Sequence, residues 1–519
     1  MAKEPQAKSP NEALKSEAID RLADCKTQKG YHETDLIECY KFAAPRRTVT
    51  DDGKRGDASL LATSLGFEVA EDLMTKLFEA FMPEQSPWVM RLAPPFANKG
   101  DATRIQKIVA EQDVEIFKFI RESLFYAELA KQGVPDASIG VLAMHIHDVR
   151  GDMPVRCVAV PIRKLEMNMG PDGRIDDRFV CEKVKYRALK AVVPQATLTK
   201  EIETKVKDHP NKEADVQWGY WRLWDKTDDE YWQHVVMIDK EVCHSAVLKG
   251  QGCCPLVIGR LNATPDYVWP EGPMIKALPD LRQYDDLRVK LIENIDFTLR
   301  PPMACDDDSL PEGTLVPGDL VARRPRNGAG NTYEKIYEPN PINAALFEVT
   351  DLERRIRRLH YSDFPQQPGK TPPTAQQWVD ELVEAQRKIG TPGFAFWSEF
   401  PRDVFARFVY IAEARRRIVP VMHEGSRVPL QAYNPAQKAQ ENQQVQTALR
   451  FLQAALASFP SEAQVLIDAE ATMRKIKEKL GDELVTFRTP QQLTEAVGRL
   501  SQLSGLGAPA TTGGIQAAA

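Results

Sequence analysis

The stretch VWPEGPMIKALPDLRQYDDLRVKLIENIDFTLRPPMACDDD, from Val268 to Asp308, opens and closes on prolines around one long amphipathic run. Its apolar residues advance by three or four positions at a time, which predicts a single apolar stripe along one helix. The predicted helix spans residues 272–300 and would be about 30 to 40 Å long at about 1.5 Å per residue. The stripe consists of Met274, Leu278, Leu281, Tyr284, Leu287, Leu291, Ile295 and Leu299.

Proline limits this helix at both ends. Pro273 and Pro301 frame it, and Pro279 falls within its first turns, so we expect a kink at the entrance or a later start. A narrow stripe on so long a helix predicts side-by-side packing against neighbouring helices. The residues that we expect in that contact are Leu281, Tyr284, Leu287, Leu291 and Ile295.

The segments that follow alternate between turn-rich and helical patterns. Residues 301–340 are crowded with Pro, Gly, Asp and Asn, which predicts a compact turn-rich module. A second helix is expected over 341–361, and it breaks at a Pro- and Gly-rich loop, 362–373. Residues 374–433 predict a long helical stretch, and 434–505 predict further helices. The tail, 506–519, has too little apolar bulk to fold.

The chain before this stretch divides into a helical and a β-rich part. A polar leader, residues 1–12, which we expect to be disordered, is followed by helical patterns over the first third of the chain. The strongest of them has apolar residues at four-residue spacing over 61–81, with Asp57 as its candidate N-cap. Over 139–248, alternating patterns and turn residues predict strands. The expected fold class is therefore α+β and predominantly helical.

Composition argues against several classes of protein. A chain of 519 residues should form roughly two to four structural units. No run approaches the roughly 18 apolar residues that span a bilayer, so we expect no membrane contact. The charged first residues carry no apolar signal-peptide core, which predicts a cytoplasmic location. The net charge of −6 argues against tight binding of nucleic acid.

Metal and cofactor sites have little support in the sequence. The eight cysteines form no CxxC pair, and Cys253 and Cys254 are adjacent, which is a poor arrangement for zinc. His145 and His147 fall on one face of a predicted strand, but no third ligand follows from the sequence. The run Asp306–Asp308 either holds Mg²⁺ or is a solvated turn. Phosphate-loop, nucleophile-elbow and HExxH motifs are missing, so we expect no enzyme activity, no metal and no cofactor.

Aromatic and basic clusters are the remaining candidates for contact with nucleic acid. Four tryptophans lie in predicted hairpin strands, where aromatic residues usually cover a core rather than stack on bases. Four arginines near a predicted helix C-terminus either contact phosphates, complement the helix dipole or pair with a neighbouring subunit. The tryptophans are Trp218, Trp221, Trp224 and Trp232, and the arginines are Arg354, Arg355, Arg357 and Arg358.

Three segments together resemble one protein family. PEGPMIKALPDLRQYDDLRVKLIENIDFTLRPPMACDDD is similar to the head-to-tail connector, or portal, proteins of short-tailed tailed bacteriophages, in which a G-x-x-x-x-ALPD helix precedes a PP turn. RRTVTDDGKRGDASLLATSLGFEVAEDLMTKLFEAFMPEQSPWVMRL resembles the N-terminal pattern of that family. PPTAQQW resembles the start of the long helix after its tunnel loop. The resemblance covers roughly residues 15–500 in the same order and departs at the C-terminus, where no long helical barrel extension follows.

The resemblance implies a portal-type architecture in a ring oligomer, with about twelve copies around a DNA channel. Its parts would be the wing 13–271, the first stem helix 272–300, the clip 301–340, the second stem helix 341–361, the tunnel loop 362–373, the spine helix of the wing 374–433 and the helical crown 434–505. The tunnel loop would bring Gln366, Gln367 and Lys370 to the channel.

A protein of this family would be a structural portal at a capsid vertex, through which the genome is packaged and ejected. Its partners would be further copies of itself, double-stranded DNA in transient and non-specific contact, and capsid, terminase and tail adaptor proteins. It would be located in the virion after assembly in the host cytoplasm. Two other classes stay open: a metal-dependent nucleic-acid enzyme built around Asp306–Asp308, and a monomeric helical adaptor or scaffold.

Overall fold

The computed structural model divides the chain into two compact units, Met1–Ala436 and Gln437–Ala519. The residues that it describes are 10–47, 61–91, 99–149, 155–226, 229–305, 316–318, 320–322, 333–335, 343–362, 393, 395–423, 426–427, 430–432, 435–458, 468, 471–473 and 475–476. Most of the described part of the second unit is helix α12 (Pro435–Ser458), which lies where the sequence predicts a helix.

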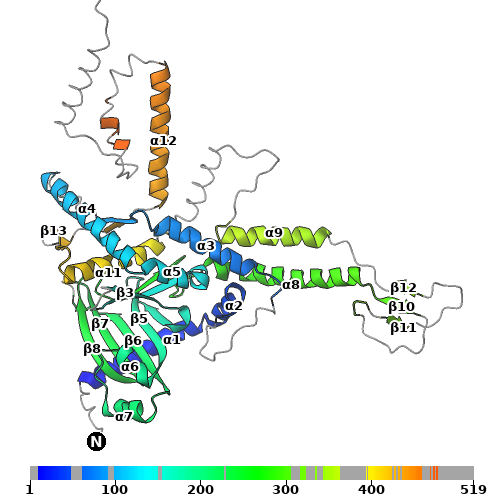
Figure 1. Cartoon of the computed structure of the whole chain (residues 1–519), viewed down its shortest axis with the longest axis horizontal. Coiled ribbons are helices and arrows are strands. Elements are labelled where there is room, and N and C mark those ends of the chain that lie inside the picture. Colours follow the sequence, from blue (N-terminus) through cyan, green and yellow to red (C-terminus); the bar gives the residue numbers. More distant parts are fainter. Residues whose placement is uncertain are drawn as a thin grey trace, which may run out of the picture. The chain divides into compact units, whose positions relative to one another are not determined.

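The described part of the first unit mixes helices with mainly antiparallel sheets, so the α+β prediction is confirmed (Figure 1). Its helices are α1 (Pro10–Gly30), α2 (Glu33–Ala43), α3 (Leu65–Phe81), α4 (Lys99–Glu122), α5 (Phe125–Gln132), α6 (Leu189–Val192), α7 (Lys200–Asp208), α8 (Pro273–Leu299), α9 (Asn343–Leu359) and α11 (Pro401–Ala414). None of the described helices is long and apolar enough to cross a membrane.

The strands of this unit form small sheets and one larger sheet. They are β1 (Val89–Arg91), β2 (Val141–Asp148), β3 (Val155–Ala159), β4 (Leu165–Met169), β5 (Ile175–Lys185), β6 (Glu213–Arg222), β7 (Tyr231–Ile238), β8 (Glu241–Lys249), β9 (Leu256–Arg260), β10 (Met303–Cys305), β11 (Leu320–Ala322), β12 (Tyr333–Lys335), β13 (Met422–His423), β14 (Ser426–Arg427) and β15 (Leu430–Ala432).

The larger sheet is an antiparallel meander in the order β4-β5-β6-β7-β8. Helix α1 covers one face of it, where Leu22 and Cys25 pack in one cluster with Phe179 and Trp221. The opposite face contributes Trp218 and other side chains to the main core. The sheet is therefore buried on both faces, which matches the many apolar residues of its strands.

The tryptophan prediction is confirmed for three of the four residues. Trp218, Trp221 and Trp232 are 8%, 0% and 2% exposed, so their rings cover cores and cannot stack on bases. Trp224 lies just after β6 and is 41% exposed; its indole Nε1 donates to Asp176 at 2.8 Å.

A second core joins the sheet β3-β2-β9 to helices α4, α5 and α11. It is rich in aromatic rings in edge-to-face contact, such as Trp88 and Phe117 with centroids 5.4 Å apart. At the end of β9, the Arg260 side chain is 2% exposed and pairs with Glu399 through contacts of 2.5 and 3.0 Å. Arg260 also donates to the carbonyl of Gly173 at 2.8 Å, so it ties β9 to the turn between β4 and β5.

Two predicted helix starts are wrong. Helix α3 begins at Leu65 with Ser64 at the N-cap, not at Asp57, because the preceding residues are held in a non-helical connection. There the Ala62 N–H donates to Asp285 at 2.9 Å. Helix α1 begins at Pro10, within the predicted leader, because proline is well suited to the first turn of a helix.

The spine helix predicted over 374–433 does not extend to its expected end. Helix α11 ends at Ala414, and residues 422–432 contain the short strands β13, β14 and β15. Arg416 has φ of 56°, in the left-handed region, and Pro420 restricts the residue before it to an extended conformation. The strand β15 then pairs with β1 of the N-terminal part, a contact between residues far apart in the sequence.

The cysteines of the described residues are free thiols. All but Cys181 are buried. Burial raises the pKa of Cys157 to about 12, so this thiol is protonated near neutral pH. Among the described residues, no group of three or more His, Cys, Asp or Glu side chains could hold a metal ion.

Histidines gather at the seam between the two sheets of the β-rich part. The rings of His145 and His147 on β2 lie 3.7 Å apart, so the prediction that they share a face of one strand is confirmed. The His145 Nε2 atom and the Tyr220 hydroxyl on β6 are 2.8 Å apart. His234 on β7 stacks on Tyr220 with centroids 4.6 Å apart. The buried Arg407 donates to the Ile146 and Cys253 carbonyls in the same seam, at 3.2 and 2.7 Å.

These surroundings disfavour the charged form of the histidines. Burial, with the positive charge of Arg407 as a further cause, lowers the pKa of His147 to about 4. The same causes, together with His244 and His147, lower the pKa of His234 to about 3. Protonation of either histidine would place a positive charge near the buried guanidinium of Arg407. The seam is therefore acid-sensitive.

We expect acid to weaken the fold through this seam. A histidine with a lowered folded-state pKa contributes stability that is complete above its unfolded-state pKa and is lost as the pH falls. For His147 the loss lies between about pH 6.5 and about 4. His147→Gln should flatten the decline in the free energy of unfolding there by up to about 1.4 kcal/mol per pH unit. Urea denaturation at a series of pH values and a fixed protein concentration would measure this change in slope.

The matched control is His209→Gln. His209 is exposed, so its replacement should leave the pH dependence of the wild type unchanged. A decline as steep in His147→Gln as in the wild type would show that this seam does not carry the acid sensitivity.

Candidate subunit interface on helices α8 and α9

Helix α8 starts inside the core. Its N-cap, Gly272, lies against the backbone of Ile139, just before β2, and a Cβ atom there would sit 1.9 Å from the Ile139 carbonyl oxygen, so only glycine fits. Pro273 follows at the first helical position, where its missing N–H costs no hydrogen bond. The helix begins at Pro273 and runs through Pro279, so the prediction of a later start is wrong.

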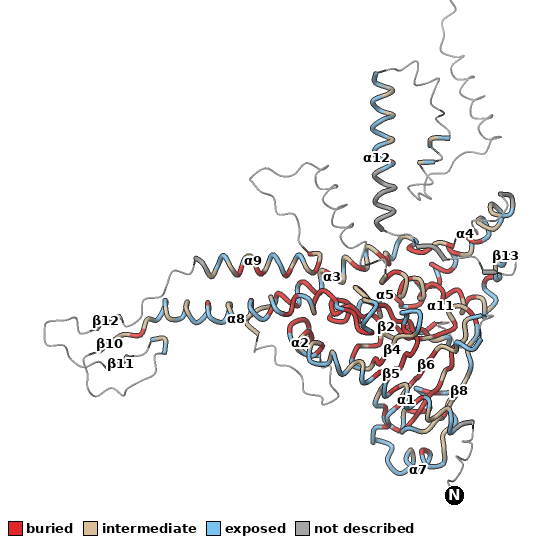
Figure 2. The backbone as a smooth tube through the Cα atoms, turned by 180° about the vertical axis from the view of Figure 1, so that it is seen from behind, coloured by how far each residue is buried: buried red, intermediate tan, exposed pale blue. Residues whose placement is uncertain are grey.

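Burial of α8 falls along its length, as the colours of Figure 2 show. Leu281, Tyr284 and Leu291 are 0%, 4% and 7% exposed, and Leu287 is partly buried against the same core. Ile295 and Leu299, further along the predicted stripe, are 46% and 74% exposed. The stripe is therefore covered near the root of the helix and open towards its C-terminal end. Met274 and Leu278, at the root, are 0% and 3% exposed.

Helix α9 packs side by side with α8, as both views of the fold agree. Its buried residues Val349, Leu352 and Ile356 recur at helical spacing and belong to the same core cluster as Leu281 and Leu291 of α8. The four-residue and three-residue steps of the two stripes let their side chains interlock. The predicted contact between the two helices is thus made within one chain.

Polar contacts fix the rotation of both helices. Arg282 of α8 forms an ion pair with Glu38 of α2, and this hydrogen bond lowers the pKa of Glu38. Gln283 donates to Glu348 of α9 at 3.3 Å. Arg357 of α9 contacts Glu68 of α3 at 3.2 Å. Exposed pairs of this kind add little stability, but they select one orientation.

Each helix of the pair also leaves apolar residues open, on a surface of its own. Successive residues of a helix are turned by about 100°, so Ile292 points away from the side on which Leu291 is buried. Ile292 and Val289 of α8 are 51% and 41% exposed. Leu346 and Phe347 of α9 are 50% and 76% exposed. Exposed apolar patches are typical of surfaces that bind another protein.

These open residues do not belong to the stripe that the sequence predicts. The pattern predicts only the stripe through Leu281 and Leu291, because its steps of three and four are the most regular. The signal for the open face is a shorter set, Val289 and Ile292, three residues apart and outside the predicted stripe. Apolar residues on more than one side of a charged helix predict more than one packing partner.

Between α8 and α9 the chain forms a three-stranded sheet in the order β11-β10-β12. β10 pairs with β11 in parallel and with β12 antiparallel, with Ala304 opposite Val321 and Glu334. These strands lie in the segment for which the sequence predicts a turn-rich module. The run Asp306–Asp308 lies outside the described residues.

The four arginines of α9 divide into two kinds. Arg355 donates to Asp351 at 2.9 Å, and Arg357 donates to Glu353 at 3.0 Å. Arg354 and Arg358 are exposed. Pairing with carboxylates of the same chain therefore accounts for two of them. Of the predicted channel residues, Gln366, Gln367 and Lys370 lie outside the described residues.

Comparison with known proteins identifies the family. A family model described as bacteriophage head to tail connecting protein matches residues 15–484. A chain titled "Virion of native gene transfer agent (GTA) particle" is 13% identical, with a TM-score of 0.37 over 85% of this chain and 98% of that chain. A chain titled "Neck of empty GTA particle computed with C6 symmetry" is 12% identical, with a TM-score of 0.33 over 80% of this chain and 90% of that chain. No curated protein matches.

Both TM-scores are low, so the assignment rests on the family model, whose match extends over most of the sequence. The match includes α8, α9 and the sheet between them, which are the elements that the sequence singles out. The chain belongs to the family of bacteriophage head-to-tail connecting proteins.

Proposed function

We propose that the chain is the portal subunit of a phage-type particle. Copies of it form a closed ring at a capsid vertex, and double-stranded DNA passes through the ring during packaging and ejection. The membership in the head-to-tail connector family and the open apolar face on α8 and α9 support this role. The ring is the functional unit, since one copy encloses no channel.

The open face is the observation that carries the proposal. Ile292 and Val289 of α8 would meet Leu346 and Phe347 of α9 on the next copy, which removes all four from water. Such a contact joins two different surfaces, and a contact of this kind closes into a ring when its rotation divides the circle. We expect about twelve copies, as the sequence resemblance implies.

Each part of the chain has a place in this proposal. The α8–α9 pair forms the stem, and the segment with β10, β11 and β12 forms the clip that meets the terminase and later the tail adaptor proteins. Residues 13–271 form the wing, in contact with the capsid, and 434–505 form the crown. The finished ring resides in the virion after assembly in the host cytoplasm.

Weak contact with DNA suits a channel. A net charge of −6 per chain gives no strong attraction for phosphates, and tight binding would require many basic contacts at once. Transient and non-specific contact lets the duplex slide. The protein then acts as a structural passage, and movement of DNA is driven by a partner.

Substitutions at two neighbouring residues of α8, Leu291 and Ile292, distinguish an effect on folding from an effect on ring assembly. Ile292→Asp introduces a charge on the open face, so it should leave the single chain folded and abolish ring formation. The expected loss is about 3 kcal/mol or more at each interface, because an unpaired charge would be buried there. Native mass spectrometry would show rings for the wild type and single chains for Ile292→Asp.

Leu291→Asp is the matched variant. Leu291 is 7% exposed within one chain, so its replacement should lower the urea midpoint of unfolding as well as the yield of rings. Normal rings from Ile292→Asp would place the contact between copies on another surface.

The predicted tunnel loop offers a second test. Lys370 in this loop would form a ring of weak positive charge in the assembled channel, since each copy contributes one. Lys370→Glu should leave assembly intact and change how well packaged DNA is retained. Unchanged genome length and unchanged leakage in particles carrying Lys370→Glu would remove the loop from the mechanism.

A further inference from the structure

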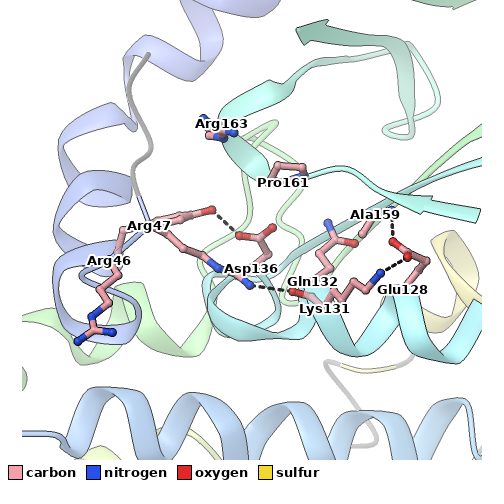
Figure 3. Close-up of a pocket in the computed structure, with 10 residues that line it drawn as sticks. Arg46, Arg47, Glu128, Lys131, Gln132, Asp136, Ala159, Pro161 and Arg163 are labelled. Atoms are coloured by element: carbon pink, nitrogen blue, oxygen red, sulfur yellow. Dashed lines mark hydrogen bonds and ion pairs between the residues drawn. The ribbon is translucent and has the colours of Figure 1, made fainter. Parts of the chain in front are cut away.

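A polar pocket lies apart from the α8–α9 face, with a volume of about 520 Å³ (Figure 3). Tyr40 of α2 and Gln132 of α5 line it, together with Asp136 of the short π-helical turn η2 (Gly133–Ala137). Arg163, in the short 3-10 helix η3 (Ile162–Lys164), contributes from the opposite side. The volume is within the range of ordinary small-ligand sites.

The floor of the pocket has two acceptor oxygens without a donor. Asp136 is fully buried, and its Oδ1 atom accepts the Tyr40 hydroxyl, whereas Oδ2 has no donor with full hydrogen-bond geometry among the described residues; the nearby Ile162 N–H and Gln132 amide only lower the pKa of the carboxyl group. Gln132 is 3% exposed, and its Nε2 donates to the Val160 carbonyl at 2.7 Å. This bond fixes the amide orientation and leaves Oε1 without a donor in the described chain. Buried polar atoms are nearly always paired, so a ligand or water belongs here.

The mouth of the pocket is basic. Arg46, Arg47, Lys131 and Arg163 line it and are exposed, against the carboxylates of Asp136 and Glu128. Glu128 pairs with Lys131, and Arg47 donates to the Lys131 and Val134 carbonyls. Arg46 and Arg163 retain the most freedom to meet a ligand, since neither makes a described side-chain bond. The local charge favours an anion.

A ligand that pairs with both the basic mouth and the acceptor oxygens of the floor must be an anion that also donates a hydrogen bond. Sulfate and the phosphodiesters of DNA are fully ionised near neutral pH and have no hydrogen to give. Inorganic phosphate keeps a P–O–H group throughout the neutral range, because its third ionisation lies far above neutral pH. A phosphomonoester keeps one only on its singly ionised fraction, because its second ionisation lies at a pKa of about 6. Arginine is also the side chain best suited to hold the remaining oxygens.

We propose that this pocket binds a hydrogen phosphate group, whose P–O–H donates to Asp136 Oδ2 and whose other oxygens are held by Arg163 and its basic neighbours. Gln132 Oε1 accepts a second hydrogen when the phosphate carries two. A carboxylate that only accepts thus selects phosphate against sulfate and against the DNA backbone.

The ionisation of Asp136 agrees with this selection at mildly alkaline pH. Burial raises its pKa to about 6, while the Tyr40 hydroxyl and the charge of Arg47 oppose the rise. At about pH 7.5 the carboxyl group is therefore mostly ionised and acts only as an acceptor.

Isothermal titration calorimetry on the purified 519-residue chain at about pH 7.5 tests the proposal. Inorganic phosphate should bind at least about tenfold more tightly than sulfate, because sulfate leaves the buried acceptor unpaired. In Asp136→Asn the amide can donate to either anion, so the ratio should fall to about one. Equal binding of both anions by the wild type, or no phosphate binding up to about 20 mM, would overturn the proposal.

Asp136 is buried, so a second variant, at an exposed pocket residue, tests the proposal independently of any folding defect in Asp136→Asn. Arg163→Ala should weaken phosphate binding several-fold, whereas Arg187→Ala, which removes an exposed arginine outside the pocket, should not. Equal effects of the two variants would mean that general charge, not the pocket, attracts phosphate, and the proposal would fall.

A competition experiment distinguishes the two sources of the phosphate group, a DNA end and free phosphate. A short oligodeoxynucleotide with a 5′-phosphate, added in large excess because only a minor fraction of its monoester carries a hydrogen at about pH 7.5, displaces inorganic phosphate if the ligand is a DNA end. Its failure to do so assigns the pocket to free phosphate. Both results support the proposal. Displacement by the same oligonucleotide with a 5′-hydroxyl would contradict it, because its diesters have no hydrogen to donate.

Discussion

Helix α8 is longer than the core that anchors it, and the rest of the structure depends on how this mismatch is resolved. Leu281 is completely buried at the root of the helix, whereas Leu299 at its end is 74% exposed. Helix α9 covers one side through Val349 and Ile356. A long apolar-sided pair that projects from its core needs a further partner, because the exposed residues otherwise favour aggregation. A neighbouring copy supplies that partner in the proposed ring.

The root of the helix pair is rigid for physical reasons that lie elsewhere in the chain. Gly272 lets the start of α8 approach the backbone at Ile139 more closely than any side chain would allow. The buried pair Arg260–Glu399 joins the two sheets to the segment before α11, and removing one partner of such a pair is costly. Repeated contacts around a ring require this rigidity, since small rotations at each root would add up and prevent closure.

Periodicity allowed the sequence to predict the elements but not their non-local partners. Helices α3, α8 and α9 follow from apolar residues at steps of three and four, and burial of Trp221 follows from its place in a hairpin. The pairing of β1 with β15 has no local signal, nor has the approach of Tyr40 to Asp136, because each joins distant segments. The open face was missed because one helix carries two apolar sets.

A three-dimensional reconstruction of the purified assembly by electron microscopy tests the central claim most directly. The portal account predicts a closed ring with a central channel, in which Ile292 of each copy lies within about 4.5 Å of α9 of the next copy. A reconstruction of single chains, or a ring in which Ile292 faces solvent, would contradict it.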